Sequence, residues 1–81
     1  RLVKNLDLRG FDTSNVTNMY GMFAGCEAEN LDLSNFDTLK VTNMVGMFEG
    51  YSGKEIILRR NQEELIDRVK KDGHGDKIRY V

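Results

Sequence analysis

The sequence contains no proline, one cysteine and one histidine among its 81 residues. The single cysteine, Cys26, cannot form a disulfide within the chain or build a metal site from several thiolates. The single histidine, His74, cannot assemble a metal site by itself. Without proline, no helix or strand is interrupted by a residue that lacks a backbone N–H. We therefore expect neither a disulfide framework nor a metal or cofactor centre as the organising element.

The sequence also lacks an excess of one charge and any long apolar run. Its net charge of −1 predicts no general attraction to nucleic acid or to membranes. Residues 1–53 carry a net charge of −3 and residues 54–81 a net charge of +2, but acidic and basic side chains alternate in the latter part. The chain contains no pattern typical of a secretory signal, a membrane span or a lipidation site. We expect no nucleic-acid binding and no insertion into a membrane.

What the sequence does contain is an internal repeat. Residues 6–30 read LDLRGFDTSNVTNMYGMFAGCEAEN and residues 31–55 read LDLSNFDTLKVTNMVGMFEGYSGKE, with 14 of 25 positions identical. A repeat of this length is typical of a solenoid, in which each repeat forms one unit that stacks on the next. The chain begins within the pattern and has no initiator methionine, so we expect it to be the last coils of a longer array.

Each repeat is predicted to begin with a strand. Leu6, Asp7 and Leu8 alternate between apolar and charged, which places the leucines inside and the aspartate outside. Asp32 occupies the same outward position in the second repeat. Because adjacent strands lie about 4.8 Å apart, we expect Asp7 and Asp32 to be neighbours. The pair is interpreted as part of a solvated acidic face, with a cation site or a glycosidase-like carboxylate pair as the alternatives.

The second half of each repeat is predicted to form a short helix. Met19, Met22 and Phe23 have the i, i+3, i+4 spacing of an apolar helix face. Thr17 is the expected N-cap, with Asn18 as the competing choice. We expect the apolar residues to face inward rather than to form a methionine-rich binding groove. The residues expected inside are Leu6, Leu8, Phe11, Val16, Met19, Met22, Phe23 and Cys26, and in the second repeat Leu31, Leu33, Phe36, Val41, Met44, Met47 and Phe48.

From Ile56 the chain starts a third repeat and then departs from it. Residues 61–71 are predicted to form an amphipathic helix with Asn61 as its N-cap, and residues 77–81 a final strand. We interpret this tail as a cap, because the end of a stack otherwise leaves strand edges and apolar side chains open. The predicted organisation is a repeat solenoid at 1–58, with coils 6–30 and 31–55 and a third strand at 56–58, followed by a divergent helix–strand cap at 59–81.

The words L-D-L-S-x-F-D-T, V-T-N-M and G-M-F-x-G-C resemble the tandem repeats of a bacterial cell-surface family of the leucine-rich-repeat-like type. The resemblance covers residues 6–50 strongly and residues 56–58 weakly. It implies an α/β fold, a short right-handed leucine-rich-repeat-like solenoid with one short strand and one short helix per coil and a C-terminal helix–strand cap. It also implies a secreted protein of the bacterial cell surface or cell wall that acts in adhesion or in interaction with a protein or glycan, without catalytic residues or cofactors.

The function expected from these observations is binding. The candidate interaction face consists of the regular outward set Asp7, Arg9, Asp32 and Ser34. We expect the partner to be a host or bacterial cell-surface protein or a glycan, and the chain to be a monomer. The alternatives are a purely structural spacer and C-terminal cap of a longer surface array, and an accessory domain of an enzyme whose catalytic domain lies elsewhere.

Overall fold

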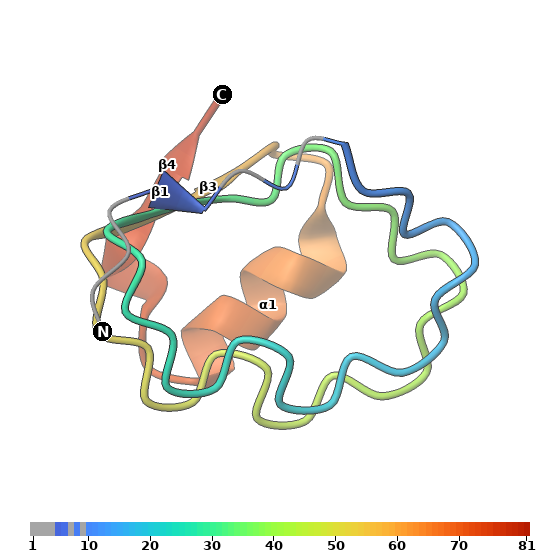
Figure 1. The fold of residues 1–81 in the computed structure, drawn as a ribbon, viewed down its shortest axis with the longest axis horizontal. Coiled ribbons are helices and arrows are strands. Elements are labelled where there is room, and N and C mark those ends of the chain that lie inside the picture. The colour runs from blue at the N-terminus through green and yellow to red at the C-terminus, as the bar shows by residue number, and fades with distance from the viewer. Residues whose placement is uncertain (1–4, 7, 9) are drawn as a thin grey trace.

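The computed structural model describes residues 5, 6, 8 and 10–81. Its strands form one four-stranded parallel sheet in the order β1 (Asn5–Leu6), β2 (Asn30–Asp32), β3 (Glu55–Leu58) and β4 (Ile78–Tyr80). Helix α1 (Glu63–Lys71) and a short 3₁₀ helix, η1 (Gly75–Lys77), connect β3 to β4. Figure 1 shows that the chain leaves β1 and β2 and returns to the next strand in wide loops of similar outline.

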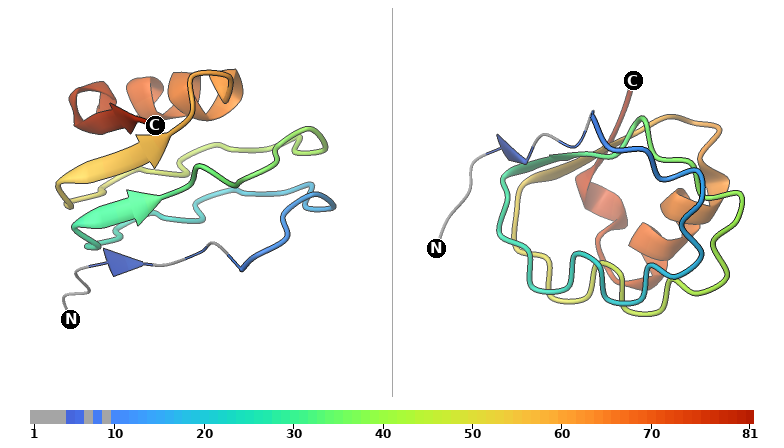
Figure 2. Two further views of the ribbon diagram at one scale, coloured as in Figure 1. Left: turned by 90° about the horizontal axis from the view of Figure 1, so that it is seen from above. Right: turned by 45° about the vertical axis from the view of Figure 1, so that its right-hand side comes forward.

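The register of the sheet follows the sequence repeat. Leu6 pairs with Leu31, and Leu31 pairs with Ile56, so each step along the sheet is one 25-residue repeat. We call residues 6–30 coil 1 and residues 31–55 coil 2. Figure 2 shows the coils in successive layers, with α1 lying over coil 2. That this stack belongs to a longer, right-handed solenoid stays a prediction, as does the domain boundary after residue 58.

The alternation in the strands decides which side chains face the core. Leu31, Leu33, Ile56 and Leu58 are completely buried, whereas Asp32 between the first two is only partly buried. Successive side chains of a strand point to opposite faces of the sheet, so one face meets the core and the other faces outward. This face of the sheet forms one side of the core.

The prediction of a short helix in the second half of each coil is wrong. The chain there makes consecutive turns, in which the N–H of Met22 donates to the carbonyl of Met19 (3.2 Å) and the third residue, Gly21, has φ of +60°. Gly25 has φ of +71° in the same position of a later turn. Residues with a Cβ rarely adopt this conformation, so the glycines permit turns that a helix would not contain.

Backbone hydrogen bonds between the coils hold these turns in place. We call residues 17–26 and 42–51, which lie opposite the sheet in Figure 1, the turn wall. Every second N–H of coil 1 in the wall donates to a carbonyl of coil 2: Met19 to Asn43 (2.8 Å), Gly21 to Val45 (3.0 Å), Phe23 to Met47 (2.8 Å) and Gly25 to Glu49 (2.9 Å). The wall is therefore a second ladder between the coils, in addition to the sheet.

Polar side chains of the repeat close the start of the wall. Asn18 Oδ1 accepts the N–H of Tyr20 (2.9 Å), and Asn43 Oδ1 makes the equivalent contact in coil 2 (3.0 Å). The asparagine, rather than the threonine predicted as the N-cap, therefore satisfies the local backbone. The threonine has a different role, because the hydroxyl of Thr42 donates to the carbonyl of Thr17 in the neighbouring coil (3.1 Å).

The core lies between the sheet and the turn wall. The rings of Phe23 and Phe48 stack with centroids 5.9 Å apart, and Phe36 lies 6.0 Å from Phe23. From the other end, Leu65 and Val69 of α1 are completely buried in the same cluster. Helix α1 thus closes the core on the side of coil 2.

Two residues of coil 1 that were predicted to be inside are exposed. Phe11 is 62% exposed and Met22 43%, whereas their counterparts Phe36 and Met47 are 7% and 0% exposed. Coil 2 lies between coil 1 and the C-terminal segment, so its apolar side chains are covered from both sides. Within the described residues, coil 1 has a neighbour on one side only.

The C-terminal segment begins its helix two residues later than predicted. Asn61 is not the N-cap: Gln62 takes that position, without a side-chain hydrogen bond to the helix. The helix ends at Lys71, and Gly73 follows with φ of +88°. Strand β4 then pairs with β3, so the segment adds a strand to the sheet while α1 takes the place that a further turn wall would occupy.

Candidate functional site

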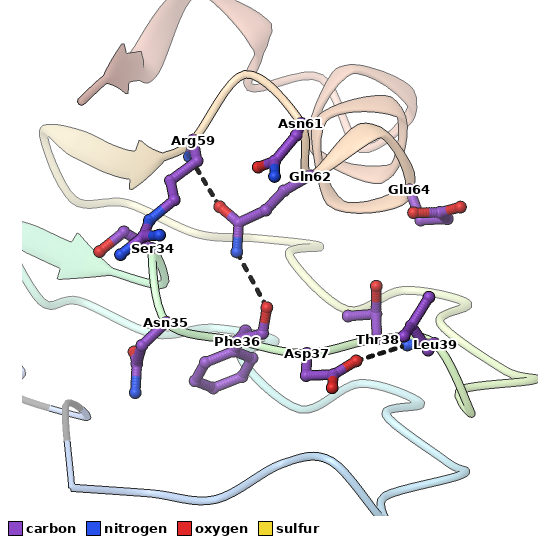
Figure 3. A pocket seen from close by; sticks show the side chains of 10 residues that line it. All are labelled: Ser34, Asn35, Phe36, Asp37, Thr38, Leu39, Arg59, Asn61, Gln62 and Glu64. Atoms are coloured by element: carbon purple, nitrogen blue, oxygen red, sulfur yellow. Dashed lines mark hydrogen bonds between the residues drawn. The ribbon is translucent and has the colours of Figure 1, made fainter.

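A groove of about 500 Å³ lies where coil 2 leaves the sheet and α1 begins (Figure 3). One side is the loop after β2 and the other is the connection from β3 into α1. Both segments follow the carboxyl ends of parallel strands, where ligand sites of α/β proteins commonly lie. We call it the strand-end groove. It is lined by Ser34, Asn35, Phe36, Asp37, Thr38, Leu39, Arg59, Asn61, Gln62 and Glu64.

Most of the residues that line the strand-end groove are polar or charged, apart from Phe36 and Leu39. It contains hydroxyls, amides, two carboxylates and the guanidinium of Arg59. Asp37 is partly engaged, because its Oδ1 accepts the N–H of Leu39 (3.0 Å). The lining contains no histidine or cysteine. Such a set can recognise polar groups of a ligand by hydrogen bonding and charge.

Gln62 ties the two sides of the groove together. Its Nε2 donates to the carbonyls of Leu33 (2.8 Å) and Phe36 (3.0 Å), and its Oε1 accepts the N–H of Arg59 (2.7 Å). Figure 3 shows the Gln62 side chain reaching from the start of α1 to the loop after β2. Because both its oxygen and its nitrogen are engaged, Gln62 is a structural element of the groove.

An amide in coil 2 makes the equivalent contact with coil 1. Asn35 Nδ2 donates to the carbonyls of Leu8 (3.3 Å) and Phe11 (3.4 Å). These carbonyls lie one repeat before the two that Gln62 reaches. The C-terminal segment therefore provides, through Gln62, the amide that a further coil would provide.

Two other side chains of the C-terminal segment also take the place of a next coil. Asp72 Oδ2 accepts the N–H of Phe48 (3.0 Å), a group whose counterpart in coil 1 donates to a backbone carbonyl of coil 2. Lys77 Nζ donates to the carbonyl of Tyr51 (3.3 Å), whose counterpart in coil 1 accepts a backbone N–H of coil 2. Side-chain groups thus satisfy backbone groups at the edge of coil 2.

The predicted interaction face is described only in part. Asp7 and Arg9 lie outside the described residues. Asp32 is partly buried, and its Oδ1 accepts the N–H of Ser34 (2.9 Å), so this carboxylate closes the turn after β2. Ser34 lines the strand-end groove. Of the predicted set, the structure therefore places Ser34 in the groove and Asp32 at the end of the strand beside it.

The side chains on the outer face of the sheet change from acidic on β2 to apolar on β3 and basic on β4. Asp32 is in register with Ile57, and Ile57 with Arg79. Arg79 Nε lies 3.1 Å from Glu55 Oε2, and Ile57 is only 7% exposed. Among the residues that the structure describes, no three histidine, cysteine, aspartate or glutamate side chains are grouped to hold a metal ion. The Asp7–Asp32 pair itself is not described, and its alternatives stay predictions.

A buried tyrosine and a partly buried histidine meet below η1. The hydroxyl of Tyr51 donates to the carbonyl of Ala28 (2.6 Å), and the side chain is 2% exposed. Burial, followed by the nearby Cys26 thiol, raises the pKa of Tyr51 to about 12. His74 lies edge-on against Tyr51, with ring centroids 5.9 Å apart. The neutral tyrosine acts as a hydrogen-bonded core residue.

Sequence reasoning placed the site on the strands and missed most of the groove. The groove combines residues 34–39 with residues 59–64, which no motif connects. The departure from the repeat after Leu58 was the available signal, because it marks where coil 2 loses the partner that the repeat would supply.

None of the described helices has the length and apolar character needed to cross a membrane. A family model described as "Mycoplasma protein of unknown function, DUF285" matches residues 3–57, which include both repeats. No curated protein and no solved structure matches the chain. The match extends over more than half of the sequence and ends close to the point where the repeat pattern is lost. The chain therefore belongs to the DUF285 family, a bacterial repeat family whose function is unknown.

Proposed function

We propose that this chain is a non-enzymatic binding module of a bacterial surface protein, in which the strand-end groove receives a protein or glycan ligand. The observation that carries the proposal is the groove itself, a polar hollow of about 500 Å³ at the carboxyl ends of β2 and β3. The secreted, cell-surface location and the role in adhesion are parts of the proposal, supported by the resemblance of the repeat words to surface-protein repeats.

The chemistry of the groove fits recognition better than catalysis. Its hydroxyls, amides and charged groups offer hydrogen bonds in several directions. Asp37 is partly used by the backbone of its own turn, and Gln62 is fully used to hold the walls. The groups left for a ligand therefore include Ser34, Thr38, Asn61 and the charged side chains at the rim.

A residue-resolved NMR titration tests the proposal. Labelled protein is titrated with cell-wall fragments, a glycan set and extracellular-matrix proteins. We expect one class to shift signals of residues 34–39 and 59–64. Binding that shifts only the outer sheet face, or no binding at all, would contradict the proposal.

Two neighbouring glutamates offer a matched pair of variants. Glu63 and Glu64 both lie exposed in the first turn of α1, but only Glu64 lines the groove. Glu63→Gln and Glu64→Gln should alter helix stability equally, because both remove one negative charge from the same helix terminus. A groove ligand should respond to Glu64→Gln alone.

The structural alternative also has a specific observation in its favour. Gln62, Asp72 and Lys77 each satisfy a backbone group that a further coil would otherwise reach. Such contacts are what a terminal cap of a repeat array requires. A spacer and cap would give no signal changes with any ligand class, although removal of these side chains would lower stability.

A further inference from the structure

We propose that the strand-end groove and the adjoining uncapped edge of coil 2 bind a peptide segment that runs parallel to residues 38–46 and follows their turns. The inference rests on the proposed function, since it names the class of partner for the same groove. It is drawn from the way in which coil 1 holds coil 2, because the same groups recur 25 residues later and have no partner there among the described residues.

The first part of the template is a threonine between the coils. Thr13 is buried (6% exposed), and its hydroxyl donates to the carbonyl of Asp37 (3.1 Å) and accepts the N–H of the same residue (2.8 Å). One hydroxyl thus binds both backbone groups of a single residue. No side chain of that residue is needed for this contact, so any residue other than proline presents the same two groups.

The second part of the template is the turn wall. Coil 1 donates from Met19 and Gly21 to carbonyls of coil 2, and the carbonyl of Thr17 accepts the N–H of Thr42 (2.7 Å). Asn18 and Asn43 form a parallel bridge in the same stretch. The edge of coil 1 therefore holds a parallel segment that forms one bridge at Asn43 and turns on either side of it.

Coil 2 presents the same groups at its own edge. The counterpart of Thr13 is Thr38, whose hydroxyl has no hydrogen bond within the described part of the chain and points into the space below Asn61 and Glu64 in Figure 3. The N–H groups of Met44 and Gly46, counterparts of the coil 1 donors, likewise have no partner among the described residues.

The C-terminal segment leaves this stretch open and covers the rest. Its side chains reach coil 2 at Phe36, Phe48 and Tyr51. Figure 1 shows α1 inside the outline of the coils, while the loops on the right-hand side extend past it. Helix α1 takes the place of a further turn wall, so a whole coil of a second copy would overlap it. A peptide segment can instead bind by adding its backbone groups to the open edge.

The sequence that coil 1 holds supplies the probe. A synthetic peptide with the sequence of residues 35–46, NFDTLKVTNMVG, contains the segment that Thr13 and the wall of coil 1 bind. It is titrated into labelled protein and followed by NMR. We expect the signals of Met44 and Gly46 to move downfield and their amide exchange to slow about tenfold at saturation, because these groups gain hydrogen bonds.

A threonine variant tests the role of the hydroxyl. Thr38→Val keeps the shape of the side chain and should weaken peptide binding about five- to tenfold. Thr17→Val makes the same change at an exposed position on coil 1 and should leave the affinity unchanged. A peptide with an N-methylated aspartate, which lacks the N–H that the hydroxyl accepts, should bind more weakly than the unmodified peptide and completes the controls.

The outcomes separate this inference from the proposed function. Peptide binding that shifts residues 17–25 instead, or that is insensitive to Thr38→Val, would overturn the inference. A glycan that binds the groove while the peptide does not would also overturn it and leave the proposed function standing. If neither binds, both proposals fail.

Discussion

Asp72 is the side chain whose removal should most directly show how the C-terminal segment holds coil 2. Its Oδ2 accepts the N–H of Phe48 (3.0 Å), and its Oδ1 lies 3.6 Å from Arg68 Nη1. The Asp72 side chain is 8% exposed and Phe48 is completely buried. Asp72→Ala therefore leaves a buried N–H without an acceptor, which is the costly way to lose a hydrogen bond.

The expected loss can be estimated from these contacts. A buried donor left unsatisfied costs about 1–3 kcal/mol, and the pair with Arg68 adds up to about 1 kcal/mol. We expect Asp72→Ala to lower the free energy of unfolding by about 2–3 kcal/mol. For a domain of this size that corresponds to a fall in Tm of about 10–20 °C. Asp72→Asn keeps an oxygen acceptor for Phe48, so its cost should be about half as large.

Urea denaturation followed by circular dichroism gives the free energies, and native-state amide exchange gives the local effect. The exchange of the Phe48 N–H should accelerate in Asp72→Ala more than that of other core amides. Asp67→Ala is the matched control, because Asp67 pairs with Lys71 (3.2 Å) at exposed positions and should cost at most about 0.5 kcal/mol. Equal stability of the two alanine variants, or unchanged exchange at Phe48, would refute the role assigned to Asp72.

Three other predictions concern the core. Phe48→Ala should lower the free energy of unfolding by about 3–5 kcal/mol in urea denaturation, because it removes a fully buried, stacked ring. A loss no larger than that of substituting an exposed residue would contradict this role of the stacked rings. Gly53→Ala should prevent native folding, seen as loss of NMR dispersion, because a Cβ there would overlap the Ala28 carbonyl and the Tyr51 ring. The pKa of Tyr51 is raised to about 12, so its contribution to stability is complete below about pH 10 and is lost as the pH rises toward 12. Tyr51→Phe should show a smaller fall in stability across that interval than the wild type.

The strands could be predicted from the sequence because their signal is local and periodic. Alternation in the LDL of residues 31–33 identifies the buried leucines, and the repeat spacing identifies which strands pair and predicts that Ile56 and Leu58 are buried as well. The core phenylalanines of coil 2 follow from the same pattern. Phe11 does not, because burial depends on what covers the residue and its counterpart Phe36 is covered from both sides.

The turn wall shows where periodicity is ambiguous. Met19, Met22 and Phe23 fit a helix face, yet they also fit turns that return the chain to the core every few residues. The glycines at 21 and 25 distinguish the two, since a helix gains nothing from repeated positive φ whereas these turns require it. The asparagine in V-T-N-M, weighed only as a competing cap, is the residue that closes the turn.

The groove could not be predicted, because it depends on how α1 is seated against coil 2. Gln62 sits 26 and 29 residues from the carbonyls that it bonds, and no sequence rule pairs an amide with main-chain oxygens at that distance. Thr38 could have been identified only by knowing that Thr13 binds the next coil. Once the contacts of Thr13 are known, a comparison of the two repeats identifies Thr38 as its counterpart.

The turn wall has a consequence for how the length of the chain can vary. Each of its backbone partners lies 24 or 25 residues away, so inserting or deleting one residue within a coil would displace every later pair of the ladder at once. The connection from β3 to β4 has no such ladder: Ile56 pairs with Ile78 after only 22 residues, and a helix bridges the gap. Changes of length should therefore be rejected between Thr38 and Gly50. Between Arg59 and Lys77 they should be tolerated only where they leave the contacts of Gln62, Asp72 and Lys77 and the buried face of α1 in place.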